Sequence, residues 1–318
     1  DWSSDVCSSD LKTLPRPKGK ATRVIYTEYD LPARTRQPHD VVVDSQGYAW
    51  YASFGEQILG RLDPKTGAIK EWPIPVVKPN RNKGVLDLEF DADGNVWIAN
   101  GFQGAVQMFD RAKETFRTYA MAAEFDGDHS ELLFIAPQNS RVDNKVWVMN
   151  NGEAVVFRVD VLTGKWEKFP AFPVPRPRLY SVFSDSQNNG WFTLIERSHI
   201  GRIDARTGEI EMYETDQKDS GPRRGMVDAQ DRIWAALNRT NSIAMFDTRT
   251  KKFQSWDTGL PEYWAYDVWV DRNGEAWAST EYADRVVRVN PKSGDLTHYL
   301  LPGPANMRRS DRKSTRLN

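Results

Sequence analysis

The sequence has almost no cysteine, no long hydrophobic run and no excess of positive charge. Cys7 is the single cysteine in 318 residues, which argues against a disulfide-stapled or cysteine-ligated fold. No apolar run approaches the length of a membrane span. The 43 Lys and Arg residues balance 44 Asp and Glu for a net charge of -1, which argues against a nucleic-acid binder, because such proteins need a basic stripe. No sustained 3.6-residue apolar period occurs, which predicts almost no helix.

The two ends of the chain share an unusual origin. Asp1 to Leu11 (DWSSDVCSSDL) translates a nucleotide string that resembles a sequencing-library adapter, and Asp311 to Asn318 (DRKSTRLN) translates its reverse complement. We therefore interpret residues 1–11 and 311–318 as adapter-derived read-through of an assembled metagenomic fragment. Cys7 is then an artefact, and we expect the natural termini, with any signal peptide, to lie outside the fragment. The Pro- and Lys-rich residues 12–20 are predicted to be a linker from an upstream domain.

What the chain does have is a repeat centred on tryptophan. Each copy reads as a hydrophobic run, Asp-x-x-Gly or a relative of it, and then Trp, as in VVVDSQGYAWYAS (41–53) and VWVDRNGEAWAST (268–280). Successive tryptophans lie 47, 50, 44, 43 and 43 residues apart, and a period of about 40–45 residues is typical of one four-stranded propeller blade. The six repeat tryptophans are Trp50, Trp97, Trp147, Trp191, Trp234 and Trp277.

Each repeat is predicted to fold into four antiparallel strands. Asp-x-x-Gly is turn chemistry between the first two strands, the second strand carries the Trp, and a second turn such as Asp63 to Gly67 precedes an aromatic edge strand. The sequence therefore predicts an all-β β-propeller over residues 21–310, truncated in its last blade. We expect six complete blades, near residues 38–76, 84–121, 133–171, 178–215, 221–258 and 263–301.

A seventh blade is suggested by the segment before the first repeat. Val24 to Leu31 (VIYTEYDL) has the pattern of a fourth strand, although no strands of a blade precede it. Three strands after Leu301 would complete that blade, which predicts seven blades in the full-length protein and an incomplete ring here, with this segment at an outer edge or unpaired. The alternative is a six-blade ring in which residues 24–31 are only a tail.

The motifs PHDVVVDSQGYAWYAS and NNGWFTLIERSHIGRIDARTGEIEMYE resemble the streptogramin lyase (virginiamycin B lyase-like) family, and the likeness covers residues 24–309. The resemblance implies a seven-bladed propeller that opens a cyclic lactone by carbon–oxygen elimination. It also implies a bound Mg²⁺ and His and Glu residues at the centre of the ring. Many members of the family have no established activity.

Only part of the family's catalytic set is present in this chain. Of the positions in register with the family's central His, only His39 keeps the imidazole, and Glu281 lies one residue beyond the position of the family's Glu. His39 and Glu281 are therefore the candidate catalytic residues, and the metal ligands stay unknown. The polar and aromatic positions in register at the ring centre, with the residues that follow two of them, are the candidate ligand-binding residues: Tyr180, Arg223, Arg224, Tyr266, Asp267 and Arg308.

Two interpretations of the central charges remain open. In the structural interpretation, Arg224 faces Asp267, Asp267 faces Arg309, and Arg309 faces Asp40, so that a belt of charge-assisted hydrogen bonds joins the blades. In the functional interpretation, Arg223, Arg224 and Arg308 form a subsite for an anion or carboxylate. Arg223 has no obvious acidic partner in the sequence, so the two interpretations are nearly balanced at that position.

Two functions follow from these observations. The first is a small-molecule-binding propeller that opens its ligand by Mg²⁺-assisted elimination. The second is a non-catalytic propeller that binds or senses a small molecule or a protein. In both cases we expect a periplasmic or secreted monomer with no nucleic-acid partner.

Overall fold

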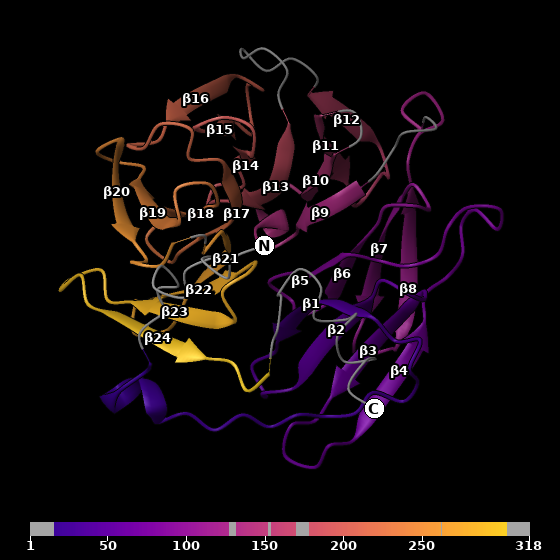
Figure 1. The fold of residues 1–318 in the computed structure, drawn as a ribbon. Helices are drawn as coiled ribbons and strands as arrows, with labels where there is room; N and C mark the ends of the chain where they lie inside the picture. Colours follow the sequence, from indigo (N-terminus) through magenta and orange to yellow (C-terminus); the bar gives the residue numbers. More distant parts are fainter. Residues whose placement is uncertain (1–15, 127–131, 152–153, 170–177, 262, 304–318) are drawn as a thin grey trace, which may run out of the picture.

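The computed structural model describes residues 16–126, 132–151, 154–169, 178–261 and 263–303. These residues form six four-stranded antiparallel sheets arranged as blades around a central axis (Figure 1). Helix is limited, within these ranges, to two 3-10 turns, η1 (Gly19–Thr22) and η2 (Ser140–Val142). The predicted all-β propeller with six complete blades is confirmed. A seventh blade stays a prediction, and the predicted adapter-derived ends, with Cys7, lie outside the described residues.

Successive strands pair with one another in every blade, so the innermost strand of a blade is always its first. The first three blades comprise β1 (Pro38–Val43), β2 (Ala49–Ser53), β3 (Ile58–Leu62), β4 (Ile69–Pro73), β5 (Asp87–Phe90), β6 (Val96–Asn100), β7 (Ala105–Asp110), β8 (Thr115–Ala120), β9 (Leu132–Ala136), β10 (Lys145–Asn150), β11 (Val155–Asp160) and β12 (Trp166–Phe169). The last three comprise β13 (Leu179–Ser184), β14 (Gly190–Leu194), β15 (His199–Ile203), β16 (Ile210–Glu214), β17 (Pro222–Val227), β18 (Ile233–Leu237), β19 (Ser242–Asp247), β20 (Lys252–Asp257), β21 (Ala265–Val270), β22 (Ala276–Thr280), β23 (Arg285–Val289) and β24 (Leu296–Leu300).

The aspartate of the repeat both closes the first hairpin and holds the tryptophan. Asp44 Oδ1 accepts the backbone N–H groups of Gln46 and Tyr48, while its Oδ2 accepts the indole N–H of Trp50 at 2.9 Å. Gly47 has a φ of 88°, which only glycine adopts without strain. The turn signal in the sequence is therefore also a side-chain anchor for the core.

This Asp–Trp hydrogen bond recurs in five of the six blades. The exception is the third blade, whose sequence copy is the loosest, and there the Trp147 indole donates to the backbone oxygen of Asn188 in the next blade at 2.8 Å. The other four pairs, besides Asp44–Trp50, are Asp91–Trp97, Asp185–Trp191, Asp228–Trp234 and Asp271–Trp277, with distances of 2.8, 2.9, 2.8 and 3.0 Å.

We expect Asp228→Ala to lower the free energy of unfolding by about 2 kcal/mol. The substitution leaves the fully buried indole N–H of Trp234 without its acceptor and removes three hydrogen bonds of the turn, from Gln230 and Arg232. Urea unfolding followed by tryptophan fluorescence measures the change, with the exposed Glu209→Gln as the matched surface control. A loss no larger than that of the control would contradict the anchoring role.

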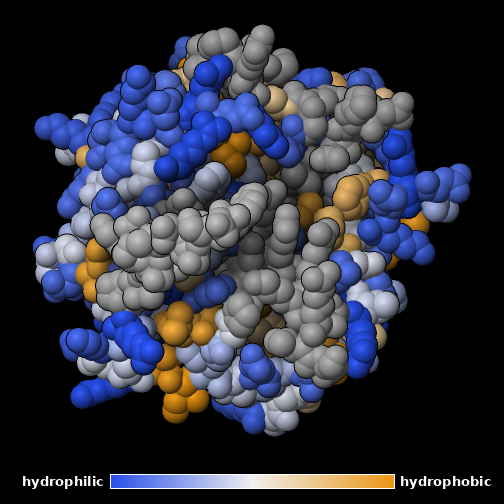
Figure 2. Space-filling view, in the orientation of Figure 1, coloured by the Kyte–Doolittle hydropathy of each residue, from blue (hydrophilic) through white to orange (hydrophobic). Residues whose placement is uncertain are grey.

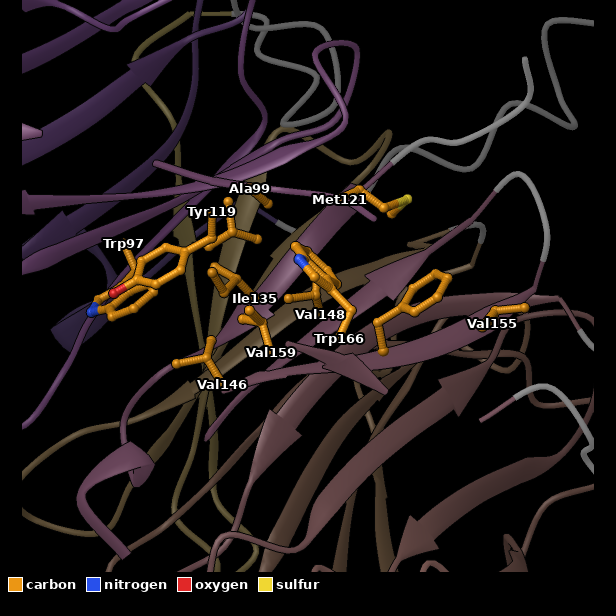
Figure 3. Close-up of a cluster of buried hydrophobic side chains, with 12 residues drawn as sticks. Trp97, Ala99, Tyr119, Met121, Ile135, Val146, Val148, Val155, Val159 and Trp166 are labelled. Carbon is orange, nitrogen blue, oxygen red and sulfur yellow. The ribbon is translucent and has the colours of Figure 1, made fainter. Parts of the chain in front are cut away.

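Neighbouring blades pack face to face through apolar side chains. Figure 3 shows the cluster between the second and third blades, where Trp97 and Tyr119 lie against residues of β9, β10 and β11. Within a blade, the second-strand Trp stacks on an aromatic of the fourth strand, as Trp97 does on Tyr119 at 5.5 Å between ring centroids. Each such pair adds about 0.5–1.5 kcal/mol beyond burial. The repeat tryptophans are therefore packing residues within and between blades.

The last and first blades are the loosest pair of neighbours in the ring. First strands pack against one another from β1 to β5 and on to β21, whereas the packing of β21 against β1 is sparser than at these junctions (Figure 1). The side chains that face this junction remain exposed: Val41 is 60% exposed, Val43 64% and Trp269 47%. The ring therefore has an opening between β21–β24 and β1–β4, and a missing seventh blade there stays a prediction.

The N-terminal segment crosses this opening on the outside. Its 3-10 turn η1 contacts β24, and the Tyr29 hydroxyl donates to the backbone oxygen of Pro64 in the first blade at 2.5 Å (Figure 1). Residues 24–31 form no strand, because no inner strand lies beside them to pair with, and Ile25 is 92% exposed. The unpaired state expected for this segment is observed, and its role as a fourth strand stays a prediction for the full-length protein. Figure 2 shows hydrophobic surface at this lower edge, below β24.

Candidate functional site

A β-bulge at the same place in four first strands directs the candidate site residues toward the axis. The pairing register shifts between Pro38 and Val41 in β1, and equivalent shifts occur in β13, β17 and β21. A bulge leaves residues unpaired and re-aims their side chains. The bulged pairs are His39–Asp40, Tyr180–Ser181, Arg223–Arg224 and Tyr266–Asp267.

Arg223 forms a buried cluster with residues of three blades. Its guanidinium makes an ion pair with Glu281, donates to the Tyr180 hydroxyl at 2.7 Å and lies 4.1 Å from the centroid of the Tyr266 ring. Asn238 also donates to Glu281, at 3.3 Å. Arg223 is 5% exposed and Glu281 1%. The expectation that Arg223 lacks an acidic partner is wrong, because Glu281, a residue far away in the sequence, reaches it across the neighbouring blade.

Arg224 joins the first, fifth and last blades. Two of its nitrogens donate to the Asp40 carboxylate at 2.8 and 3.1 Å, and one also reaches Asp267 at 3.4 Å. Burial alone would raise the pKa of Asp40, but Arg224 and a hydrogen bond to His39 hold it well below its ordinary value. The predicted Arg224–Asp267 contact is confirmed. Arg224 also makes the contact with Asp40 that was expected of Arg309. Arg309 itself lies outside the described residues.

Two further carboxyl groups lie at the channel, both on β5. Asp87 is 6% exposed, and burial, together with the charges of Asp40 and Glu89, raises its pKa well above the ordinary value. Burial and the charge of Asp40 likewise raise the pKa of Glu89 to about 8. Burial also raises the pKa of Asp267. Neither Asp87 nor Glu89 was among the site residues expected from the sequence, because an acid in a short strand has the pattern of a solvent-facing residue.

The carboxyl groups of Asp87, Glu89 and Asp267 border a cavity of about 740 Å³ along the axis. All six first strands line it, with apolar walls and the charged groups of Asp87, Glu89, Arg224 and Asp267. A smaller hollow of about 310 Å³, lined by His39 and Trp269 among others, lies at the opening between β21 and β1 and shares wall residues with the cavity. The channel is therefore bordered along its length by the opening in the ring.

The structure brings together most of the candidate residues but not all of them at the cavity. Tyr180, Arg223, Arg224, Tyr266 and Asp267 contact one another, while Arg308 lies outside the described residues. His39 borders the smaller hollow. Glu281 lines neither space, because it is buried behind Arg223.

The described residues do not fit a bound metal ion. No group of three His, Cys, Asp or Glu side chains in these ranges could hold one. Asp40 is already paired with Arg224 and His39, and Glu281 with Arg223. The Mg²⁺ expectation therefore stays a prediction, and no chemical step is derived through a metal here.

The chain resembles lyase structures in shape. The chain superposes on a streptogramin B lyase with a TM-score of 0.74 at 20% identity, covering 87% of each chain. It superposes on virginiamycin B lyase from Staphylococcus aureus with a TM-score of 0.71 at 19% identity, covering 86% of each. The chain has the β-propeller fold of the streptogramin lyases. That fold is not confined to them, since an extracellular domain of a one-component system from B. thetaiotaomicron matches with a TM-score of 0.62 at 16% identity, over 82% of this chain and 36% of that one.

Sequence comparison gives only short matches. No family model matches the chain. The photosystem II assembly lipoprotein Ycf48 of Prochlorococcus marinus (strain MIT 9312) is 23% identical over 103 residues, 32% of this chain. Ycf48 of Synechococcus sp. (strain RCC307) is 32% identical over 68 residues, 21% of this chain. The matched regions span 30% and 20% of the length of these relatives, so they carry no conclusion about function.

Proposed function

We propose that this propeller binds a small molecule in its central channel. The observation that carries the proposal is the axial cavity of about 740 Å³, with apolar walls and a few converging charged groups. Small-molecule sites typically have volumes of about 300–1,000 Å³ and this mixture of walls and polar groups. The bulges of the first strands support it further, because they place polar side chains at the axis that blade packing does not require.

The test is a thermal-shift screen of the full chain against a small-molecule panel that includes cyclic lactone peptides. Val43→Trp narrows the channel, because Val43 lines the cavity and has an exposed side chain. Val142→Trp, at another exposed valine away from the cavity, is the matched control. We expect Val43→Trp to abolish the ligand-induced shift and the control to retain it. An equal shift in both variants would place the site elsewhere.

The second candidate is a carbon–oxygen lyase acting on a ligand in the same channel. The fold likeness to the streptogramin lyases and the position of His39 beside the channel support it. His39 Nδ1 is 3.0 Å from Asp40 Oδ1, a carboxylate that orients the imidazole for proton transfer. Liquid chromatography with tandem mass spectrometry of a cyclic lactone peptide incubated with the chain, with and without Mg²⁺, tests the candidate, because elimination yields a linear isomer of unchanged mass. Ring opening that His39→Ala abolishes would support it, and no ring opening in either condition would leave a non-catalytic binder.

Export from the cytoplasm is part of the same proposal. The similarities to a lipoprotein and to an extracellular domain support a periplasmic or secreted location. Within the described residues, no helix is long and apolar enough to cross a membrane. Fractionation of cells that express the full-length gene tests the location, and recovery in the cytoplasm alone would contradict it.

A further inference from the structure

We propose that the channel selects a small organic cation, an amine or amidine on an apolar body, and that Asp87, Glu89 and Gln138 hold its charged group. The inference rests on the proposed binding function and names the chemical class of the ligand. It replaces the anion or carboxylate ligand of the functional interpretation.

The arginines near the axis are already neutralised by the protein. Arg223 is paired with Glu281 and Arg224 with Asp40 and Asp267. Both guanidinium groups also lie against aromatic rings, at 4.1 Å from Tyr266 for Arg223 and 4.6 Å from Phe134 for Arg224. An anionic ligand would have to displace these buried partners, which costs more than a new ion pair returns.

The carboxyl groups of β5 lack such compensation. In the described part of the chain, no Lys, Arg or His makes an ion pair with Asp87 or Glu89. The ionisable groups that act on this pair are Asp40 from β1, Arg224 from β17 and Asp267 from β21. Four carboxyl groups therefore share one guanidinium, and a cation bound beside Asp87 and Glu89 would stabilise their ionised forms.

Neutral acceptors around the pair favour a hydrogen-bond donor as well. Asp87 accepts one backbone N–H, that of Ile135, at 2.9 Å. Gln138 forms a side-chain hydrogen bond with Glu89, while its own Oε1 is buried at the cavity wall without a partner among the described residues. Two carboxyl groups and one amide oxygen suit the three N–H donors of an ammonium group.

The rest of the cavity fits the apolar part of such a ligand. Phe90 and Phe134 line it beside the carboxyl groups, and Val182, Met226 and Val227 line the facing strands. An aromatic or branched amine would bury its body against these side chains while its charge lies at β5. A compact inorganic cation would leave most of this wall uncovered.

Proton release accompanies binding of a cation at this position. With its pKa at about 8, Glu89 is largely protonated at pH 7, and a bound ammonium group stabilises the ionised form. The affinity should therefore rise with pH up to about 8 and level off above it, as long as the probe keeps its own charge. A neutral ligand would show neither effect.

The test compares two probes of equal shape, phenethylamine and 2-phenylethanol, by calorimetric titration of the full chain at pH 8. We expect the amine to bind at least about tenfold more tightly than the alcohol, with proton release seen as a dependence of the heat on buffer ionisation. Glu89→Gln keeps the shape and removes the charge, and we expect it to weaken amine binding about tenfold. The exposed Glu209→Gln is the matched control and should change nothing.

The outcomes separate this inference from the proposed function. Equal binding of the two probes, or amine binding unaffected by Glu89→Gln, would overturn the choice of a cation. If Val43→Trp still prevents those probes from binding, binding in the channel is supported whatever the charge of the ligand. Amine binding that survives Val43→Trp would place the amine outside the channel and overturn both, and no binding of either probe would overturn the cation inference alone.

Discussion

Replacing Arg223 by alanine is expected to lower the free energy of unfolding by about 3–5 kcal/mol. The guanidinium joins Glu281, Tyr180 and the face of Tyr266, and its removal takes one ion pair away from the Glu281 carboxylate, which is 1% exposed. Urea unfolding followed by tryptophan fluorescence measures the loss. The exposed Arg206→Ala removes the same side chain from a surface turn and should cost little.

A double substitution separates the buried charge from the packing at this position. In Arg223→Met with Glu281→Leu, neither charge remains and most of the volume is kept, so the stability should return close to that of the unsubstituted chain. A loss below about 1 kcal/mol for Arg223→Ala would contradict this account of the cluster. A double variant as unstable as Arg223→Ala would show that the loss comes from the hydrogen bond to Tyr180 and the ring contacts.

The second large effect is a fall in stability as the pH rises from about 4 to 8. Glu89 holds its proton in the native chain up to about pH 8 but releases it near pH 4 in the unfolded chain. The native state therefore binds more protons across this window, and stability decreases with pH until Glu89 ionises in both states. We expect Glu89 to account for a decrease of about 3 kcal/mol. The raised pKa values of Asp87 and Asp267 act in the same direction.

Glu89→Gln tests the origin of this pH dependence. Glutamine cannot ionise, so the variant should lose much of the slope and be more stable than the unsubstituted chain at pH 8. Urea unfolding at several pH values measures both quantities, and Glu209→Gln should keep the original slope. A stability that rises between pH 4 and 8 would show that Glu89 is ionised in the native chain throughout the window.

The fold was predictable because its signals are local and repeated. The turn aspartate and the strand-two Trp lie six residues apart in a blade such as Asp44–Trp50, so one short motif carries both the hairpin and its anchor. Repetition then fixes the arrangement of blades without any long-range information. The unpaired state of Val24 to Leu31 was predictable as well, because strand formation needs a partner and no described strand of its own blade lies beside it.

The candidate site was predictable only in part, because its pairings join distant blades. Register along the first strands identified Arg224 and Asp267 as neighbours, and they are. The Arg223–Glu281 pair was missed because Glu281 follows the second strand of the next blade and is displaced by one residue from the expected position. The chemistry of Glu89 depends on burial and on Asp40, which lies on another blade, so composition around residue 89 could not reveal it.

The opening between the last and first blades makes the ring easier to deform at that place than elsewhere. Each of the other four blades packs closely against two neighbours, whereas the last and first blades each pack closely against one. The deformation that needs the least energy is therefore a change in the width of the opening between them. Because the opening borders the channel, that deformation also changes the width of the channel. The N-terminal segment spans the opening from β24 to Pro64 and restrains this motion. The N-terminal segment and the Arg224–Asp40 hydrogen bonds, which join the fifth blade to the first, together limit how far the channel can widen.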